Sequence, residues 1–211
     1  MNRVAFRCAL LLLGIALFPA SAFAHPVVDI SYWLGFKLDS KGLEGINETW
    51  EFDQEHSTQI LQMFDANHDG KIEPSELPAL EQGYFDHLKQ YSYFTTIVID
   101  GKAASTGTAS KFSADYHDNR MFYHFHIALR ISASKEEHEV DVTIWDPTYF
   151  TDLEPANSNA ITVQAPENLT AKIYTANDHR HFYNMAPDVI LIKKPPFYLP
   201  MQVLKFKISQ P

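Results

Sequence analysis

The stretch Val27-Val-Asp-Ile-Ser-Tyr-Trp-Leu-Gly-Phe36 has an apolar residue at every second position. Successive side chains of a strand point to opposite faces, so one face of this strand would carry Val28, Ile30, Tyr32, Leu34 and Phe36. After a polar turn at 39–45, the stretch Ile46–Phe52 can return beside the first strand. The pattern predicts a β-hairpin with one buried face.

Further strand-like segments follow along the chain. They are short runs rich in β-branched or aromatic residues, at Phe94–Ile99, Met121–Ile131, Val140–Trp145, Ile161–Val163, Ala171–Tyr174, Val189–Ile192 and Met201–Ile208. The stretch 147–159 has no periodicity and is expected to be a loop. Because two sheets can bury their apolar faces against each other, we predict a mainly β protein built as an antiparallel β-sandwich.

Helical patterns interrupt the strands near the start of the chain. Asp53 can cap a helix that runs to about Phe64. A second helix, from about Pro74 to Gln90, would place four apolar residues on one stripe, namely Leu77, Leu80, Tyr84 and Leu88. We therefore expect a single domain over residues 25–211, α+β overall, with a helix-loop-helix inserted at about residues 53–90.

Residues 1–24 resemble a secretory signal peptide. Arg3 and Arg7 precede the apolar run Ala9–Phe18, and Ala22-Phe23-Ala24 provides a small-x-small cleavage site. The apolar run is too short to cross a bilayer. We expect an exported protein of the bacterial periplasm that has no membrane insertion after cleavage and begins at His25.

Composition excludes several classes of function. The single cysteine, Cys8, lies in the expected signal peptide, so the processed chain would have no disulfide, thiolate metal site or cysteine nucleophile. A formal net charge of -9 argues against nucleic acid and anionic lipid as partners, because both require a positive surface. Hydrophobic residues make up 45% of the chain, which suffices for a buried core.

The segment between the two expected helices matches an EF-hand calcium loop. Calcium prefers six to eight oxygen ligands, and a loop with ligands at positions one, three, five, seven, nine and twelve wraps around it. Gly70, at position six, permits the sharp turn. The predicted ligands are Asp65, Asn67, Asp69, the carbonyl of Lys71, Glu73 and Glu76. We expect calcium as the cofactor, bound by one loop that has no second EF-hand to pair with.

Histidines offer a possible second metal site. His124 and His126 alternate on an expected strand whose other face is apolar, so both would project from the outward face. His179 and His181 repeat the His-x-His pattern, and His25 would supply a free amine as well as its ring. Each pair alone is typical of exposed histidines, whereas all five together would suit nickel, cobalt, zinc or copper.

The order of several short motifs resembles domain of unknown function 1007, a family of exported proteins labelled as the periplasmic component of an uncharacterised ABC-type transport system. The resemblance runs from His25 to about Thr175, and its motifs are Ala24-His25-Pro26, Trp50-Glu-Phe52-Asp53, the calcium loop, Tyr93-Phe94-Thr95, Ile99-Asp100-Gly101-Lys102 and Trp145-Asp-Pro-Thr-Tyr-Phe150. It implies a periplasmic accessory role in nickel or cobalt transport, with a membrane metal transporter as partner. Val27 stands where family members commonly have a second terminal histidine.

These observations together predict a calcium-binding, non-enzymatic accessory component of a metal-ion transport system. Two alternatives stay open. One is a copper-dependent oxidative enzyme that uses His25, and the other is a calcium-ordered module for protein interaction. Motifs of the common hydrolases, zinc helices and phosphate-binding loops do not occur in the sequence.

Overall fold

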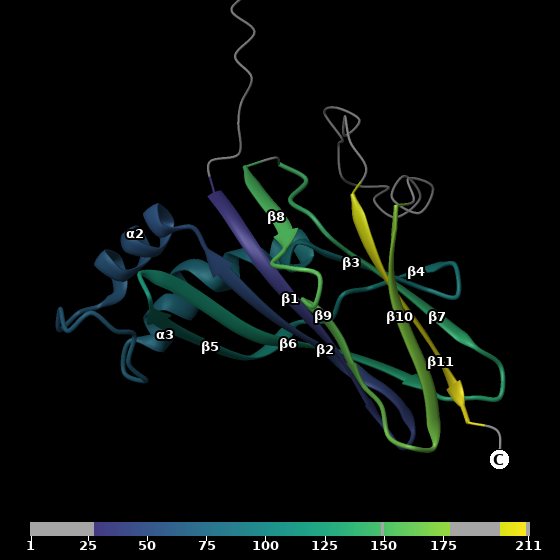
Figure 1. The fold of residues 1–211 in the computed structure, drawn as a ribbon. Coiled ribbons are helices and arrows are strands. Elements are labelled where there is room, and N and C mark those ends of the chain that lie inside the picture. The colour runs from purple at the N-terminus through teal and green to yellow at the C-terminus, as the bar shows by residue number, and fades with distance from the viewer. Residues whose placement is uncertain (1–27, 149, 178–198, 210–211) are drawn as a thin grey trace, which may run out of the picture.

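The computed structural model describes residues 28–148, 150–177 and 199–209. The fold is mainly β, with a six-stranded and a five-stranded sheet that share one hydrophobic core, and with helices between the second and third strands (Figure 1). The prediction of a mainly β, two-sheet protein is confirmed. The expected signal peptide and the expected strand Val189–Ile192 lie outside the described residues.

The larger sheet has the order β5-β6-β2-β1-β8, and β9 also pairs with β1. Its first two strands, β1 (Val28–Asp39) and β2 (Gly42–Phe52), form the predicted hairpin, with Tyr32 opposite Trp50. The turn is tighter than expected because both strands extend into the 39–45 segment. β6 (Arg120–Ser132) pairs antiparallel with β2 and brings the later aromatic strand beside the hairpin.

Three elements of this sheet differ from the prediction. The segment 147–159, expected to be a loop, contains β8 (Thr151–Pro155), and both β8 and β9 (Ile161–Gln164) pair parallel with β1. β5 (Ala109–His117) was not predicted. These strands lie at or near the sheet edges and bury few side chains, so they lack the apolar alternation that marks a half-buried strand.

The smaller sheet has the order β10-β11-β7-β3-β4. Its pairings are antiparallel throughout, and its strands are β3 (Thr95–Ile99), β4 (Lys102–Ala104), β7 (His138–Ile144), β10 (Leu169–Asn177) and β11 (Pro200–Ile208). Only β4, a three-residue strand, was not predicted. β11 and β7 supply most of the fully buried side chains on this side of the core.

The first helix begins where the sequence predicts, whereas the second helical segment differs from the prediction. Asp53 caps α2 (Gln54–Phe64), and its Oδ1 accepts from the backbone N–H of His56 at 2.9 Å. The single expected second helix is instead a short α3 (Leu77–Leu80), a π-helix η1 (Glu81–Phe85) and a 3₁₀ segment η2 (Asp86–Phe94). η2 ends in a left-handed turn, where Ser92, Tyr93 and Phe94 have φ between 52° and 56°.

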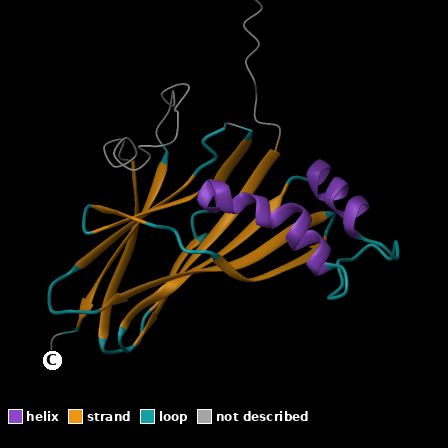
Figure 2. Ribbon diagram, turned by 180° about the vertical axis from the view of Figure 1, so that it is seen from behind, coloured by secondary structure: helices purple, strands orange, loops and turns teal. Residues whose placement is uncertain are grey.

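The helices complete the core where the smaller sheet does not reach. Figure 2 shows them lying across the strands of the larger sheet. Phe85 stacks on Phe112 with ring centroids 4.1 Å apart and lies 5.1 Å from Phe125, while Ile60 of α2 is fully buried. Within the described ranges, no helix is long and apolar enough to span a membrane.

Candidate functional site

The segment Asp65–Glu76 connects α2 to α3 and projects from the end of the molecule that carries the helices (Figure 1). Its first half curls around the carboxylate of Asp65. The Asp65 Oδ1 accepts from the backbone N–H of Asp69 at 3.1 Å, and its Oδ2 accepts from that of Gly70 at 2.8 Å. Gly70 has φ of 83°, the left-handed conformation that the loop pattern assigned to it.

The carboxylate of Glu76 ties the two ends of the loop together. Its Oε1 accepts from the backbone N–H of Ala66 at 2.7 Å, and its Oε2 accepts from that of Glu73 at 3.0 Å. The side chain of Asn67 turns inward as well, because its Oδ1 accepts from Asp69 N–H at 2.9 Å. Loop positions one, three and twelve therefore all bend back onto the loop's own backbone.

Burial and charge suit this loop to a cation. Asp65 is 6% exposed and Glu76 is 7% exposed, and burying a carboxylate is costly unless a positive group compensates it. In the described part of the chain, neither carboxylate has a Lys, Arg or His within ion-pair distance. Among the described residues, the hydrogen-bond partners of both carboxylates are backbone N–H groups.

The loop does not hold its carboxylates in a finished coordination shell. Across residues 28–148, 150–177 and 199–209, no three His, Cys, Asp or Glu side chains converge to hold a metal ion. The EF-hand ligand set also includes the amide oxygen of Asn67 and the carbonyl of Lys71, which supply oxygen without a charge.

The two histidines of β6 lie among polar side chains of the adjacent strands. His124 Nε2 lies 2.8 Å from Asp115 Oδ2, and His124 Nδ1 lies 3.0 Å from Thr49 Oγ1. His126 has only 8% exposure, and its Nδ1 lies 2.8 Å from Asn47 Oδ1. Each ring thus binds its own neighbours on adjacent strands. The other candidates, His25, His179 and His181, lie outside the described residues.

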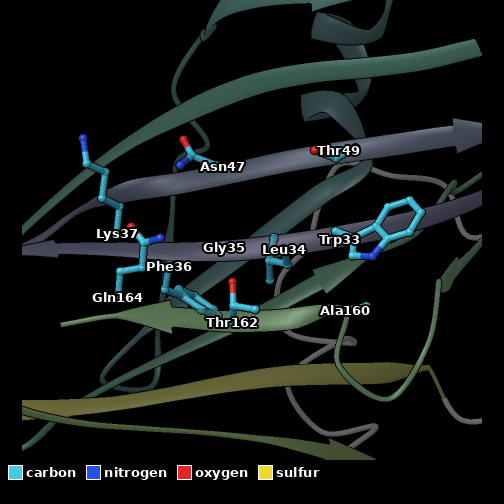
Figure 3. A pocket seen from close by; sticks show the side chains of 10 residues that line it. All are labelled: Trp33, Leu34, Gly35, Phe36, Lys37, Asn47, Thr49, Ala160, Thr162 and Gln164. Carbon is cyan, nitrogen blue, oxygen red and sulfur yellow. The ribbon is translucent and has the colours of Figure 1, made fainter. Parts of the chain in front are cut away.

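A second feature, which sequence reasoning missed, is a hollow on the outward face of the larger sheet (Figure 3). We call it the outer trough. It has a volume of about 240 Å³ and lies along β1 between β2 and β9. Its outward-facing walls are Trp33, Lys37, Asn47, Thr49, Thr162 and Gln164, and Gly35 forms the middle of its floor. The sequence signal was a tryptophan and a glycine at adjacent outward positions of the first strand.

Two comparisons relate the chain to known proteins. An 89-residue match, 36% identical, links the chain to the "Uncharacterized 15.5 kDa protein in trpE 3'region" of Spirochaeta aurantia. It covers 42% of this chain and 63% of that relative. The model of a family described as "Protein of unknown function (DUF1007)" matches residues 10–188. Since that match spans most of the sequence, the chain belongs to the DUF1007 family.

Proposed function

We propose that this protein is an exported, periplasmic calcium-binding protein without enzymatic activity, in which the loop Asp65–Glu76 binds one Ca²⁺. The observation that carries the proposal is the pair of buried carboxylates, Asp65 and Glu76, which lie at the first and last ligand positions of an EF-hand spacing and have no cationic partner in the described part of the chain. Bound calcium would neutralise the negative charge of these two carboxylates.

Calcium at this position would act on the whole fold. The incoming helix is fixed to the larger sheet through Ser57, whose hydroxyl donates to the carbonyl of Phe52 at 3.1 Å and accepts from Met121 N–H at 2.8 Å. The outgoing segment buries Leu80 and Phe85 against the same sheet. Because the loop joins two segments that pack on one surface, closing it around an ion would stabilise both attachments.

The size of the effect follows from binding linkage. A ligand that binds only the folded state at about 100 times its Kd adds about 2.7 kcal/mol to the free energy of unfolding. For a domain of this size that corresponds to a rise in Tm of about 5–10 °C. Extracellular calcium modules have Kd values on the order of 10⁻⁴–10⁻³ M, so millimolar calcium is the appropriate range for titration.

The test compares wild type with Glu76→Gln, by calorimetric titration and by thermal unfolding in calcium or in chelator. We expect calcium to raise the Tm of wild type and to leave Glu76→Gln unchanged. In chelator the variant should unfold at the same temperature as wild type or higher, since it removes one buried negative charge. The matched control is Glu137→Gln, which makes the same charge change at an exposed position outside the loop. Equal calcium heats from wild type and Glu76→Gln would contradict the proposal.

The finer proposal is that the protein serves a membrane metal-ion transporter as an accessory component. Its support is the family resemblance, together with the histidines at 25, 179 and 181. His124 and His126 contribute less than the sequence indicated, because both rings already bind neighbouring polar side chains. Elemental analysis of untagged, correctly processed protein distinguishes the readings: calcium alone supports the calcium module, and stoichiometric nickel, cobalt or zinc supports the transport role. Stoichiometric copper with oxygen-dependent turnover supports the oxidative enzyme.

A further inference from the structure

The outer trough is built from cross-strand rows of the larger sheet. Asn47 of β2 lies directly opposite Gly35 of β1, and Gly35 lies opposite Thr162 of β9. Opposed residues of neighbouring strands share a face, so the three form one outward row. The next row along the strands places Thr49 opposite Trp33. Figure 3 shows the indole of Trp33 at one end of the trough and the side chain of Lys37 at the other.

Gly35 makes the trough hollow. A Cβ at this position would lie 3.5 Å from Thr162 Oγ1 and 3.9 Å from Asn47 Cβ, which is ordinary van der Waals contact. A larger residue could therefore occupy the position without a clash, and its side chain would fill the space. The sheet itself does not require a glycine here, because the φ of Gly35 is not in the left-handed region. The fold would therefore tolerate a larger residue at position 35, and the glycine leaves the trough open.

The hydroxyl of Thr49 is oriented by a chain of hydrogen bonds. The Asp115 carboxylate is 2.8 Å from Nε2 of His124, so in the neutral ring that nitrogen carries the proton and donates to it. Nδ1 of the same ring then has a free lone pair and accepts the hydroxyl proton of Thr49 across 3.0 Å. With the ring neutral, Thr49 therefore presents an acceptor oxygen to the trough.

The side-chain amide of Asn47 offers a hydrogen-bond donor to the trough, whereas Thr49 offers an acceptor. Its Oδ1 lies 2.8 Å from Nδ1 of His126, and burial lowers the pKa of that ring, which keeps it neutral at pH 7. When Nδ1 donates to Oδ1, the NH₂ group of Asn47 remains to donate to a ligand. Asn47 and Thr49 therefore offer one donor and one acceptor, two residues apart on the same strand.

The charges in the trough match a neutral ligand. Among the described residues that line it, Lys37 alone carries a charge, and its Nζ is already 3.0 Å from Glu44 Oε2. The remaining polar side chains are amides and hydroxyls, and Trp33 adds a flat apolar surface with a polar N–H. A pyranose ring has the complementary character, because its C–H groups form an apolar face and its hydroxyls both donate and accept.

We propose that the outer trough binds a neutral saccharide, with one sugar ring stacked on Trp33 and its hydroxyls bonded to Asn47, Thr49 and Thr162. The volume of about 240 Å³ is below the range of drug-sized pockets and corresponds to one or two sugar units. His124 and His126 act as positioning residues that set the hydrogen-bond directions of Thr49 and Asn47.

The experiment titrates ¹⁵N-labelled protein with a panel of neutral mono- and disaccharides that covers the common hexoses and N-acetylhexosamines. Nuclear magnetic resonance follows the Trp33 indole N–H at one end of the trough and the Gly35 amide in the middle of its floor. We expect at least one saccharide to shift both signals in a saturable manner, in calcium and in chelator alike. The proposal is overturned if no member of the panel shifts them, or if charged oligosaccharides or peptides do so instead.

Two variants and one control locate the site. Gly35→Val fills the trough with a residue that suits a strand, and Trp33→Ala removes the stacking surface. Each should weaken saccharide binding by at least about tenfold. The control is Phe122→Ala, which removes another aromatic ring from the outward face of the same sheet, where it stacks on His117 with centroids 4.2 Å apart. Binding that survives Gly35→Val in a folded variant would place the saccharide elsewhere and refute the assignment.

Discussion

Glu48→Gln should make the folded protein more stable at high pH, because it removes a buried carboxyl group whose ionisation destabilises the core. Glu48 is 1% exposed and points from β2 into the space between the two sheets. Its Oε2 accepts from Trp50 Nε1 at 3.0 Å, and its Oε1 lies 2.9 Å from the hydroxyl of Thr95 on the smaller sheet. A buried carboxyl group in this position is favourable only in the protonation state that satisfies the neighbouring hydrogen-bond donors and acceptors.

The hydrogen-bond donors and acceptors around Glu48 favour its protonated form. The Thr95 hydroxyl has one hydrogen but lies 2.9 Å from two acceptors, the Oε1 of Glu48 and the carbonyl of Tyr93. If Glu48 carries a proton, it donates to Thr95, Thr95 donates to Tyr93, and every group is satisfied. If Glu48 is ionised, one of the two acceptors loses its partner and a charge lies buried in the core.

The expected change in the free energy of unfolding follows from the pKa of Glu48. Burial raises the pKa of Glu48 from its ordinary value of 4.5 to about 7, whereas the hydrogen bonds from Thr95 and Trp50 oppose that rise. Between these two values the folded protein holds a proton that the unfolded chain has lost, so the free energy of unfolding falls as pH rises. A difference of about 2.5 pH units at 1.36 kcal/mol each amounts to a loss of about 3 kcal/mol, complete above about pH 7.

Glutamine reproduces the protonated pattern at every pH. Its NH₂ group can donate to Thr95 while its oxygen accepts from Trp50. Urea unfolding of wild type, Glu48→Gln and the exposed control Glu137→Gln, at about pH 5 and about pH 8.5 in saturating calcium, measures the difference. We expect Glu48→Gln to match wild type at the lower pH and to be more stable by up to about 3 kcal/mol at the higher pH. Parallel pH profiles for wild type and Glu48→Gln would refute the reasoning.

Three other substitutions test local features of the fold. Ser92→Gly should raise Tm by about 2–4 °C in a thermal scan, because Ser92 is exposed and has φ of 54°, where a side chain costs about 1 kcal/mol; an unchanged Tm would contradict the strained turn. Tyr123→Phe should raise the free energy of unfolding in urea by about 1 kcal/mol, since the buried hydroxyl has no hydrogen-bond partner among the described residues; a loss would mean that it has one. Gly45→Ala should lower the free energy of unfolding in urea by about 2 kcal/mol, because its Cβ would lie 2.5 Å from both the Ile127 carbonyl and His126; wild-type stability would show that β6 can move away.

Features encoded within a few consecutive residues could be predicted from the sequence. The alternation in 27–36 predicted the strand β1, and Asp53 predicted the start of α2, because both signals arise from backbone periodicity and local hydrogen bonds. The positive φ of Gly70 follows for the same reason, since the twelve loop residues are contiguous. The irregular end of the second helix could not be predicted, because the stacking of Phe85 on Phe112 depends on a strand that comes later in the chain.

The histidines show why the candidate site needed the structure. Periodicity placed His124 and His126 on the outward face, and together with His25, His179 and His181 they were considered as a possible second metal site. Strand register decides their neighbours: Thr49 is opposite His124 and Asn47 is opposite His126, while Asp115 approaches from β5 beyond an irregularity in the pairing. Each ring therefore has a specific partner on β2, and the partners, rather than the rings, line the trough.

The trough itself depends on three segments that are far apart in the sequence. Trp33 and Gly35 come from the first strand, and Asn47 from its hairpin partner, which sequence alone could place nearby. Thr162 reaches Gly35 only because β9 pairs parallel to β1, directly after β8 has done the same. Parallel pairing at that edge leaves no signal in a short strand of half-buried residues, since nothing in its alternation specifies a partner. The loop Asp65–Glu76 is encoded by contiguous residues and the trough by register, so a substitution in β9 that shifts its pairing should abolish the proposed saccharide binding and leave the proposed calcium binding intact.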